Sequence, residues 1–207
     1  MMIQLYGMGP SRSFRCLWAL EEAGIPYEYI SISLGQSSGG GSQTLEYKSL
    51  NFQGKVPTLV DDALVLTESA AILNYIAALA PDKALVPVND IALRARYDEI
   101  CYFVLSDLEQ PLWTNGKHRF VLPEPQRVPE VLATAEWEFN KSLRALDHHL
   151  SNRQYAVGDQ FTCADILIAQ TIRWADRFKF EVPDRFLSYQ EALFDRPACQ
   201  RAQAKLA

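Results

Sequence analysis

Residues 54–69, GKVPTLVDDALVLTES, combine backbone and side-chain features that suit the binding of an extended peptide. Pro57 stands at the start of an apolar run, and because proline cannot donate to a sheet ladder, it belongs at a strand's first residue, on an edge or in a turn. An edge that begins in this way leaves neighbouring backbone groups free to pair with a peptide ligand. Glu68 and Ser69 then precede a helical stretch, residues 70–76, whose N-terminus could take a carboxylate. The segment therefore predicts a peptide-ligand site.

The composition and the cysteine pattern narrow the class of protein. A formal net charge of -5 over 207 residues argues against an electrostatic nucleic-acid binder. No apolar run approaches the roughly 20 residues needed to cross a bilayer, and the chain starts directly with a strand-like segment, which leaves no room for a secretory signal. The four cysteines are scattered without a CxxC pair, which favours a reducing compartment and gives no zinc signature. We expect a cytoplasmic protein with no metal site and with neither nucleic acid nor a membrane as partner.

The N-terminal part of the chain alternates strands and helices in the order β-α-β-loop-β-β-α. Alternating side chains predict the strands, and apolar residues at helical spacing predict the helices. Gly24 is placed to end the first helix as a left-handed cap. Mixed parallel and antiparallel pairing in this order is typical of an α/β layer of thioredoxin-like type. The predicted elements are a strand at 3–7, a helix at 13–23, a strand at 27–32, a flexible loop at 37–42, a hairpin around Asp61-Asp62 and a helix from Ser69.

The composition changes after residue 80. Residues 81–89 hold two prolines and no periodic pattern, which is typical of a linker between domains. The remainder of the chain has helical periodicity and no internal repeat. We therefore predict an α/β plus all-α architecture: an N-terminal thioredoxin-like domain over residues 1–80, the linker, and a C-terminal helical bundle over residues 90–207.

Within the helical part, two stretches are long and amphipathic, residues 91–108 and 128–150. Between them, residues 111–129 predict an irregular segment, long for a helical bundle. Thr162 and Asp165 form a capping-box-like helix start, with aspartate where glutamate or glutamine is commoner. These two residues are expected to contribute stability and no chemistry.

Short motifs along the chain give a second indication of the fold and function. They are Leu5-Tyr6-Gly7, Ser11-Arg12-Ser13 leading into residues 17–22, residues 51–75, residues 161–166, and Arg196-Pro197-Ala198. Each motif is weak alone, but in this order and at this spacing they resemble the cytosolic glutathione S-transferase family over essentially the whole chain. The resemblance implies a thioredoxin-like domain followed by a helical bundle, in agreement with the predicted elements. It favours one of the bacterial groups over the vertebrate alpha, mu and pi forms.

The resemblance also implies how glutathione binds. Pro57 would adopt the cis form, and Val56 before it would pair through its backbone with the cysteinyl part. Glu68 would meet the γ-glutamyl ammonium, while the hydroxyl and amide of Ser69 would meet the α-carboxylate at a helix N-terminus. Lys55 would meet the glycyl carboxylate as a point charge, with an ordinary solvated lysine as the alternative. Glutathione is thus the expected co-substrate.

Catalysis in this family requires a glutathione thiolate at neutral pH. A free thiol titrates near pKa ~8.5, and a helix N-terminus with a nearby donor lowers that pKa. The resemblance places these parts in the turn between the first strand and the first helix. Ser11 is the first candidate donor, Ser13 the second and Tyr6 the third, and Arg12 is a candidate contact for the glutathione carboxylates or the thiolate. Helix capping by the serines and a plain surface role for the arginine are the alternatives.

The same turn departs from the family pattern. Alignment through the first strand puts Met8 near the place of the theta and delta serine, whereas counting back from Gly24 puts Pro10 there. A beta-class cysteine would fall at Arg12. The transferase class is therefore left open. No cysteine lies in the turn, and Cys16, a full turn inside the helix, is expected to be buried and inert.

We expect a glutathione transferase that directs the thiolate at an apolar electrophile. The resemblance implies a homodimer and an electrophile site lined by the second domain. Two alternatives stay open: another glutathione-dependent reaction, such as peroxide reduction, dehalogenation or isomerisation, and a non-catalytic binding module on the same scaffold. Tyr97, Tyr102, Phe103 and Trp113 are predicted to form an aromatic wall of the electrophile site, with packing in a helical core as the alternative for Phe103.

Overall fold

The computed structural model of the chain describes residues 2–151 and 153–206. They form two compact units: the first holds the chain up to Val86 together with the segment from Phe194 onward, and the second runs from Pro87 to Leu193. The change of unit after Val86 falls within the predicted linker, residues 81–89. The C-terminal segment, however, groups with the first unit, whereas the sequence placed it in the helical domain, residues 90–207.

The first unit is built on a mixed four-stranded sheet. Its strands are β1 (Ile3–Gly7), β2 (Tyr27–Ser31), β3 (Thr58–Asp61) and β4 (Leu64–Thr67), in the order β2-β1-β3-β4. β1 pairs in parallel with β2 and antiparallel with β3, and β3 and β4 form an antiparallel hairpin. α1 (Ser13–Ala23) supplies the crossover that a parallel pair requires. The thioredoxin-like prediction is confirmed.

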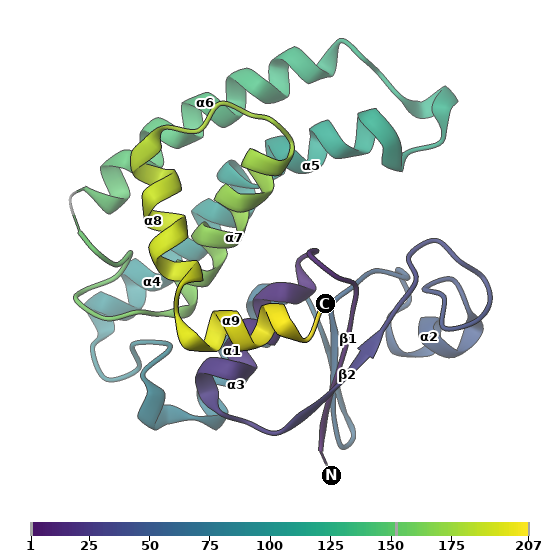
Figure 1. The fold of residues 1–207 in the computed structure, drawn as a ribbon, viewed down its shortest axis with the longest axis horizontal. Coiled ribbons are helices and arrows are strands. Elements are labelled where there is room, and N and C mark those ends of the chain that lie inside the picture. Colours follow the sequence, from purple (N-terminus) through teal and green to yellow (C-terminus); the bar gives the residue numbers. More distant parts are fainter. Residues whose placement is uncertain (1, 152, 207) are drawn as a thin grey trace. The chain divides into compact units, whose positions relative to one another are not determined.

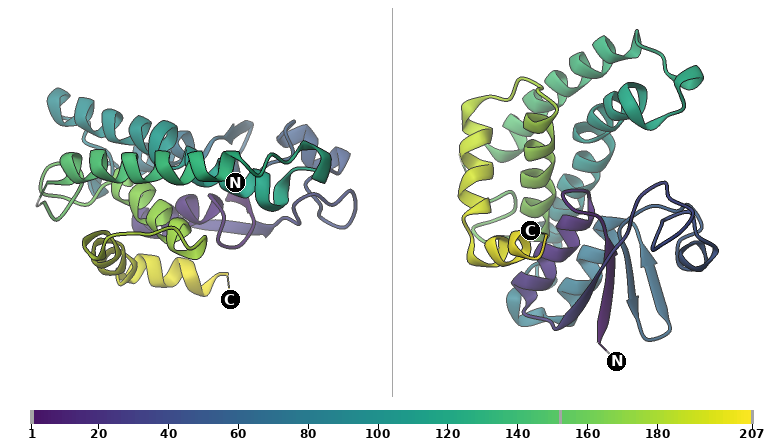
Figure 2. Two further views of the ribbon diagram at one scale, coloured as in Figure 1. Left: turned by 90° about the horizontal axis from the view of Figure 1, so that it is seen from above. Right: turned by 45° about the vertical axis from the view of Figure 1, so that its right-hand side comes forward.

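Helices cover both faces of this sheet. α1, α3 (Ser69–Leu79) and α9 (Pro197–Ala204) lie on one side, and α2 (Leu45–Leu50) lies on the other (Figures 1 and 2). The sequence predicted a loop at residues 37–42 but no helix at the place of α2, because a helix of six residues is too short to show a helical period. Thr44 begins α2 by accepting a hydrogen bond from the Tyr47 N–H at 3.2 Å.

The core of the first unit lies between the sheet and the two helices α1 and α3. Leu5 and Leu59 of the strands, Leu17 of α1 and Ile72 of α3 have no accessible surface. α1 ends as predicted, because Gly24 takes a φ of 67° and its N–H donates to the Leu20 carbonyl. The core thereby fixes the helices whose N-termini belong to the predicted site.

The second unit is all helical, as predicted. The predicted cap at its α7 is confirmed, since the Thr162 N–H donates to Asp165 Oδ2 at 2.7 Å. The segment predicted to be irregular, residues 111–129, is instead helical as far as Val121. Among the described residues, no helix is both long and apolar enough to span a membrane. The helices are α4 (Ile91–Phe103), α5 (Gln110–Gly116), α6 (Val131–Leu150), α7 (Cys163–Arg177) and α8 (Asp184–Phe194), with π-helical turns at Val104–Leu108 and Lys117–Val121.

Candidate functional site

The register of the sheet brings three predicted segments to one edge of the first unit. Tyr6, near the end of β1, pairs with Thr58 at the start of β3, and Thr58 pairs with Thr67 at the end of β4. One end of these three strands therefore carries the turn that follows β1, Pro57 just before β3, and Glu68 just after β4.

The segment before β3 presents a free backbone. The Val56–Pro57 peptide bond is cis, as expected. Pro57 is buried and Val56 is half-buried. Within residues 2–151 and 153–206, neither the N–H nor the C=O of Val56 takes part in a backbone hydrogen bond. This backbone can therefore pair with an extended ligand.

A buried polar network holds this segment in place. The Lys55 carbonyl accepts from the Tyr47 hydroxyl at 2.5 Å and from Asn51 Nδ2 at 2.9 Å. Both side chains also bond Thr58 Oγ1, at 2.9 and 3.1 Å. The Lys55 side chain itself is exposed. No sequence pattern predicts this role for Tyr47 and Asn51, because the network joins a short helix, a loop and a strand.

The N-terminus of α3 is open. Its first intrahelical hydrogen bond runs from the Ile72 N–H to the Glu68 carbonyl at 3.0 Å, so the N–H groups of residues 69–71 have no intrahelical acceptor. Ser69 is 4% exposed. Glu68 is exposed, does not cap the helix, and has a φ of 66°, a strained backbone conformation that costs about 1–3 kcal/mol and clusters at functional sites. Such an N-terminus attracts a carboxylate.

Two side chains of α1 bind Ser69 from the protein side. Arg15 Nη1 donates to Ser69 Oγ at 3.3 Å, and the Cys16 thiol donates to the Ser69 carbonyl at 3.8 Å. Both Arg15 and Cys16 lack accessible surface. Burial raises the pKa of the Cys16 thiol far above its usual range, which agrees with the predicted inert cysteine. Arg15 was not predicted as a site residue, although a cation between the apolar Phe14 and Leu17 of a helix indicates a buried charge with a role.

The turn between β1 and α1 holds a pair of serines. Ser13 Oγ accepts from the Met8 N–H at 3.3 Å and from the Ser11 hydroxyl at 3.0 Å, while Ser11 Oγ accepts from the Ser13 N–H at 3.2 Å. Ser13 is fully buried, whereas Ser11 and Arg12 are half-buried. Of the two hydroxyls, that of Ser11 is the one with access to a ligand.

A glycine allows this turn to lie close to the sheet. A Cβ added to Gly7 would lie 2.7 Å from the Ser13 Cβ and 2.8 Å from the Tyr29 ring. Only a residue without a side chain leaves room for that approach. Gly7 therefore sets the distance between the end of β1 and the first residue of α1.

Tyr6 points elsewhere. Its hydroxyl donates to Gln4 Oε1 at 3.3 Å, and its ring packs against that of Tyr47 with 5.9 Å between centroids. Burial raises the pKa of the Tyr6 phenol, and the carboxylates of Glu28 and Glu46 raise it further. The structure thus brings Ser11, Ser13, Val56, Pro57, Glu68 and Ser69 to one edge, but it directs the Tyr6 hydroxyl away from the serine pair.

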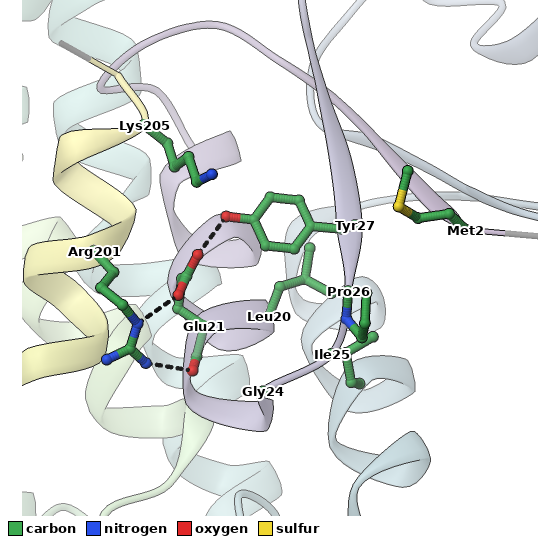
Figure 3. Close-up of a pocket in the computed structure, with 9 residues that line it drawn as sticks. All are labelled: Met2, Leu20, Glu21, Gly24, Ile25, Pro26, Tyr27, Arg201 and Lys205. Atoms are coloured by element: carbon green, nitrogen blue, oxygen red, sulfur yellow. Dashed lines mark hydrogen bonds and ion pairs between the residues drawn. The ribbon is translucent and has the colours of Figure 1, made fainter.

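A cavity of about 370 Å³ lies at the other end of α1, between α1, β2 and α9 (Figure 3). Its polar groups bond one another: Glu21 accepts from Tyr27 at 2.6 Å and from Arg201 at 2.7 Å. None of the predicted site residues lines this cavity. The candidate site therefore lies at the end of the sheet where β1 ends and β3 begins, with the free backbone of Val56 and the N-termini of α1 and α3.

The aromatic residues proposed for the electrophile site have different surroundings within the helical unit. Tyr97 is buried, whereas Tyr102 is exposed. The Phe103 ring lies 4.8 Å from the His149 ring, between centroids. Tyr97 thus belongs to the core of that unit.

Comparison with known proteins decides the family. The model of the glutathione S-transferase N-terminal domain matches residues 1–78, and that of the C-terminal domain matches residues 110–191. The chain belongs to the glutathione S-transferase family. Glutathione S-transferase 1 of Dianthus caryophyllus is 30% identical to it, over 99% of this chain and 94% of the relative. Probable maleylacetoacetate isomerase 1 of Drosophila melanogaster is 31% identical, over 86% of this chain and 71% of the relative.

A solved structure extends the likeness to three dimensions. The theta class glutathione S-transferase of Xanthomonas axonopodis pv. citri, solved with glutathione bound, is 31% identical, with a TM-score of 0.79. The match covers 97% of this chain and 96% of that one. The predicted family and fold of this transferase are thereby confirmed.

Proposed function

We propose that this chain conjugates the thiolate of glutathione to an apolar electrophile. The observation that carries the proposal is the arrangement at one edge of the sheet. There, the unpaired Val56 backbone lies at the same edge as the open N-terminus of α3 with Glu68 and Ser69. An extended tripeptide with an amino-acid head group has groups of matching chemistry for both parts.

The proposed roles follow from the charge of each group. The Glu68 carboxylate pairs with the γ-glutamyl ammonium, and the Ser69 hydroxyl and amide receive the α-carboxylate. The Val56 backbone pairs with the cysteinyl residue. The exposed Lys55 ammonium meets the glycyl carboxylate, and Arg12 at the start of α1 adds positive charge near the sulfur.

The Ser11 hydroxyl is proposed as the donor to the thiolate: in the structure it donates to Ser13 Oγ, and it turns to the sulfur once glutathione binds. Ser13 is fully buried and accepts two hydrogen bonds from within the turn, so it supports Ser11 and does not itself reach the ligand. The thiol proton passes to solvent, the sulfur forms a bond to the electrophilic carbon, and the leaving group departs with its electron pair. The reaction is accelerated because the thiolate is stabilised and is held close to the electrophile.

A conjugation assay with an activated aryl chloride tests this proposal. We expect Ser11→Ala to lower kcat about 100-fold while it leaves the dissociation constant of glutathione within about threefold, because the hydroxyl stabilises the reacting thiolate. Ser13→Ala is the comparison, with an expected loss of stability. Full activity of Ser11→Ala would remove Ser11 from the mechanism.

Isomerisation with glutathione is a second candidate. It is supported by the likeness to the probable maleylacetoacetate isomerase, and it uses the same thiolate, which adds to the substrate and leaves unchanged. A panel of cis-dienoic acids, aryl chlorides and hydroperoxides separates the reactions. Absence of all turnover together with absent or only millimolar glutathione binding in calorimetry would favour a non-catalytic binding protein.

The assembly and the division of labour are part of the proposal. Residues 1–80 are proposed to hold glutathione, and residues 90–207, beyond the linker 81–89, to contribute the electrophile site. We further propose a homodimer, by analogy with the family. Light scattering at micromolar concentration tests it, and a monomer mass would exclude it.

A further inference from the structure

Arg15 is a charged side chain at a position where the proposed ligand cannot touch it. It has no accessible surface, and burial of a guanidinium is costly unless the group forms hydrogen bonds. One of those bonds is to Ser69: Arg15 Nη1 donates to Ser69 Oγ at 3.3 Å. Arg15 can therefore act through Ser69 on a ligand at the α3 N-terminus.

The chemistry of the two groups fixes the direction of this hydrogen bond. A guanidinium has donors only, so Ser69 Oγ must be the acceptor. The serine hydroxyl has a single proton, and with its oxygen engaged by Arg15 that proton is left to be donated on the other side. A hydrogen bond from a charged donor also polarises the hydroxyl and strengthens its own donation.

A second contact fixes the backbone of the same residue. The Cys16 thiol donates to the Ser69 carbonyl at 3.8 Å. α1 therefore holds Ser69 by its side chain and by its main chain, at the first residue of α3.

We propose that Arg15 is a positioning residue for the α-carboxylate of the γ-glutamyl group. Through its hydrogen bond to Ser69 it orients the serine proton toward that carboxylate, an inference that rests on the proposed glutathione function. It touches neither glutathione nor the reacting sulfur.

A comparison of two peptides tests this role. Glutathione and γ-aminobutyryl-cysteinylglycine differ only in the α-carboxylate, and calorimetry gives the dissociation constant of each. We expect Arg15→Met to weaken glutathione binding about tenfold and to change the affinity for the analogue less than twofold. Ser69→Ala should do the same. The double variant should bind glutathione about as well as Ser69→Ala alone, because Arg15 acts through Ser69.

Control variants separate positioning from a loss of structure. Glu21→Gln removes an ion pair of α1 with Arg201 and should lower stability without changing the ratio of the two affinities. If Arg15→Met does not fold, Arg15→Gln, which also lacks the charged donor, takes its place. The inference would be overturned if either folded variant kept the wild-type ratio of the dissociation constants of glutathione and the analogue. It would also be overturned if the double variant lost as much glutathione affinity as the product of the two single losses. Wild-type protein that binds no glutathione would overturn the proposed function as well.

Discussion

Replacement of Arg196 by methionine tests how α9 holds α1. Arg196 Nε and Nη2 donate to Glu22 Oε1 and Oε2 at 2.6 and 2.9 Å, a bidentate ion pair between residues 174 positions apart. The Glu22 side chain is 10% exposed and that of Arg196 is 30% exposed. Glu22 Oε1 also accepts from Trp18 Nε1 at 2.9 Å. The pair is thus intermediate between a surface ion pair and a buried one.

The magnitude follows from this intermediate burial. Surface pairs contribute about 0–1 kcal/mol, whereas breaking a buried pair costs about 3–5 kcal/mol because a charge is left without its partner. Arg196→Met leaves the mostly buried Glu22 carboxylate with the Trp18 indole as its donor, so we expect a loss of about 2 kcal/mol in the free energy of unfolding. Glu22→Gln leaves the more exposed guanidinium, which water can solvate, and should cost about 1 kcal/mol.

Urea denaturation followed by tryptophan fluorescence measures these losses. Arg96→Met is the control, because the Arg96 and Glu99 side chains of that ion pair are 70% and 44% exposed, and we expect no measurable loss of stability. A loss for Arg196→Met that equals the control, or one smaller than that for Glu22→Gln, would refute the reasoning from burial.

Three further predictions concern the glutathione edge and α1. Asn51→Ala removes the 2.9 Å hydrogen bond to the Lys55 carbonyl, so we expect calorimetry to show about fivefold weaker glutathione binding and urea titration a loss of about 1–2 kcal/mol. Gly7→Ala places a Cβ 2.7 Å from a neighbouring side chain and should destabilise the fold by about 1–3 kcal/mol. Burial acts to raise the pKa of Glu21, but hydrogen bonds, one of them from Arg201, outweigh it and hold that pKa below its usual range. The stability from this pairing is therefore present above the unfolded pKa, about 4.3, and is lost as the pH falls through the folded value. Arg201→Met should accordingly cost about 0.5–1 kcal/mol at pH 7 and progressively less below pH ~4.

Each of these predictions has a result that contradicts it. Wild-type affinity in Asn51→Ala would mean that the network does not position the Val56 backbone. A Gly7→Ala variant as stable as wild type would show that the turn relaxes freely. A cost of Arg201→Met that grows as the pH falls would reverse the assigned direction of the Glu21 pKa.

The sequence by itself determined the local features of this transferase. The left-handed cap at Gly24 and the capping box of Thr162 and Asp165 depend on neighbours within a few residues, so the pattern alone predicts them. The same holds for the proline that precedes β3 and for the Glu68-Ser69 pair that opens α3. Each is a property of a strand end or a helix end, and such ends have strong residue preferences.

Only the tertiary structure decided which of these ends meet and what holds them. Arg15 and Ser69 are 54 positions apart, and they form a hydrogen bond because α1 and α3 pack on the same side of the sheet. α9 belongs to the first unit through partners 174 and 180 positions away, a pairing that no local period reveals. The Tyr6 ring packs against that of Tyr47 in α2, a helix that the sequence pattern did not predict. Contacts of this kind depend on the register and packing of distant segments, which residue preferences do not encode.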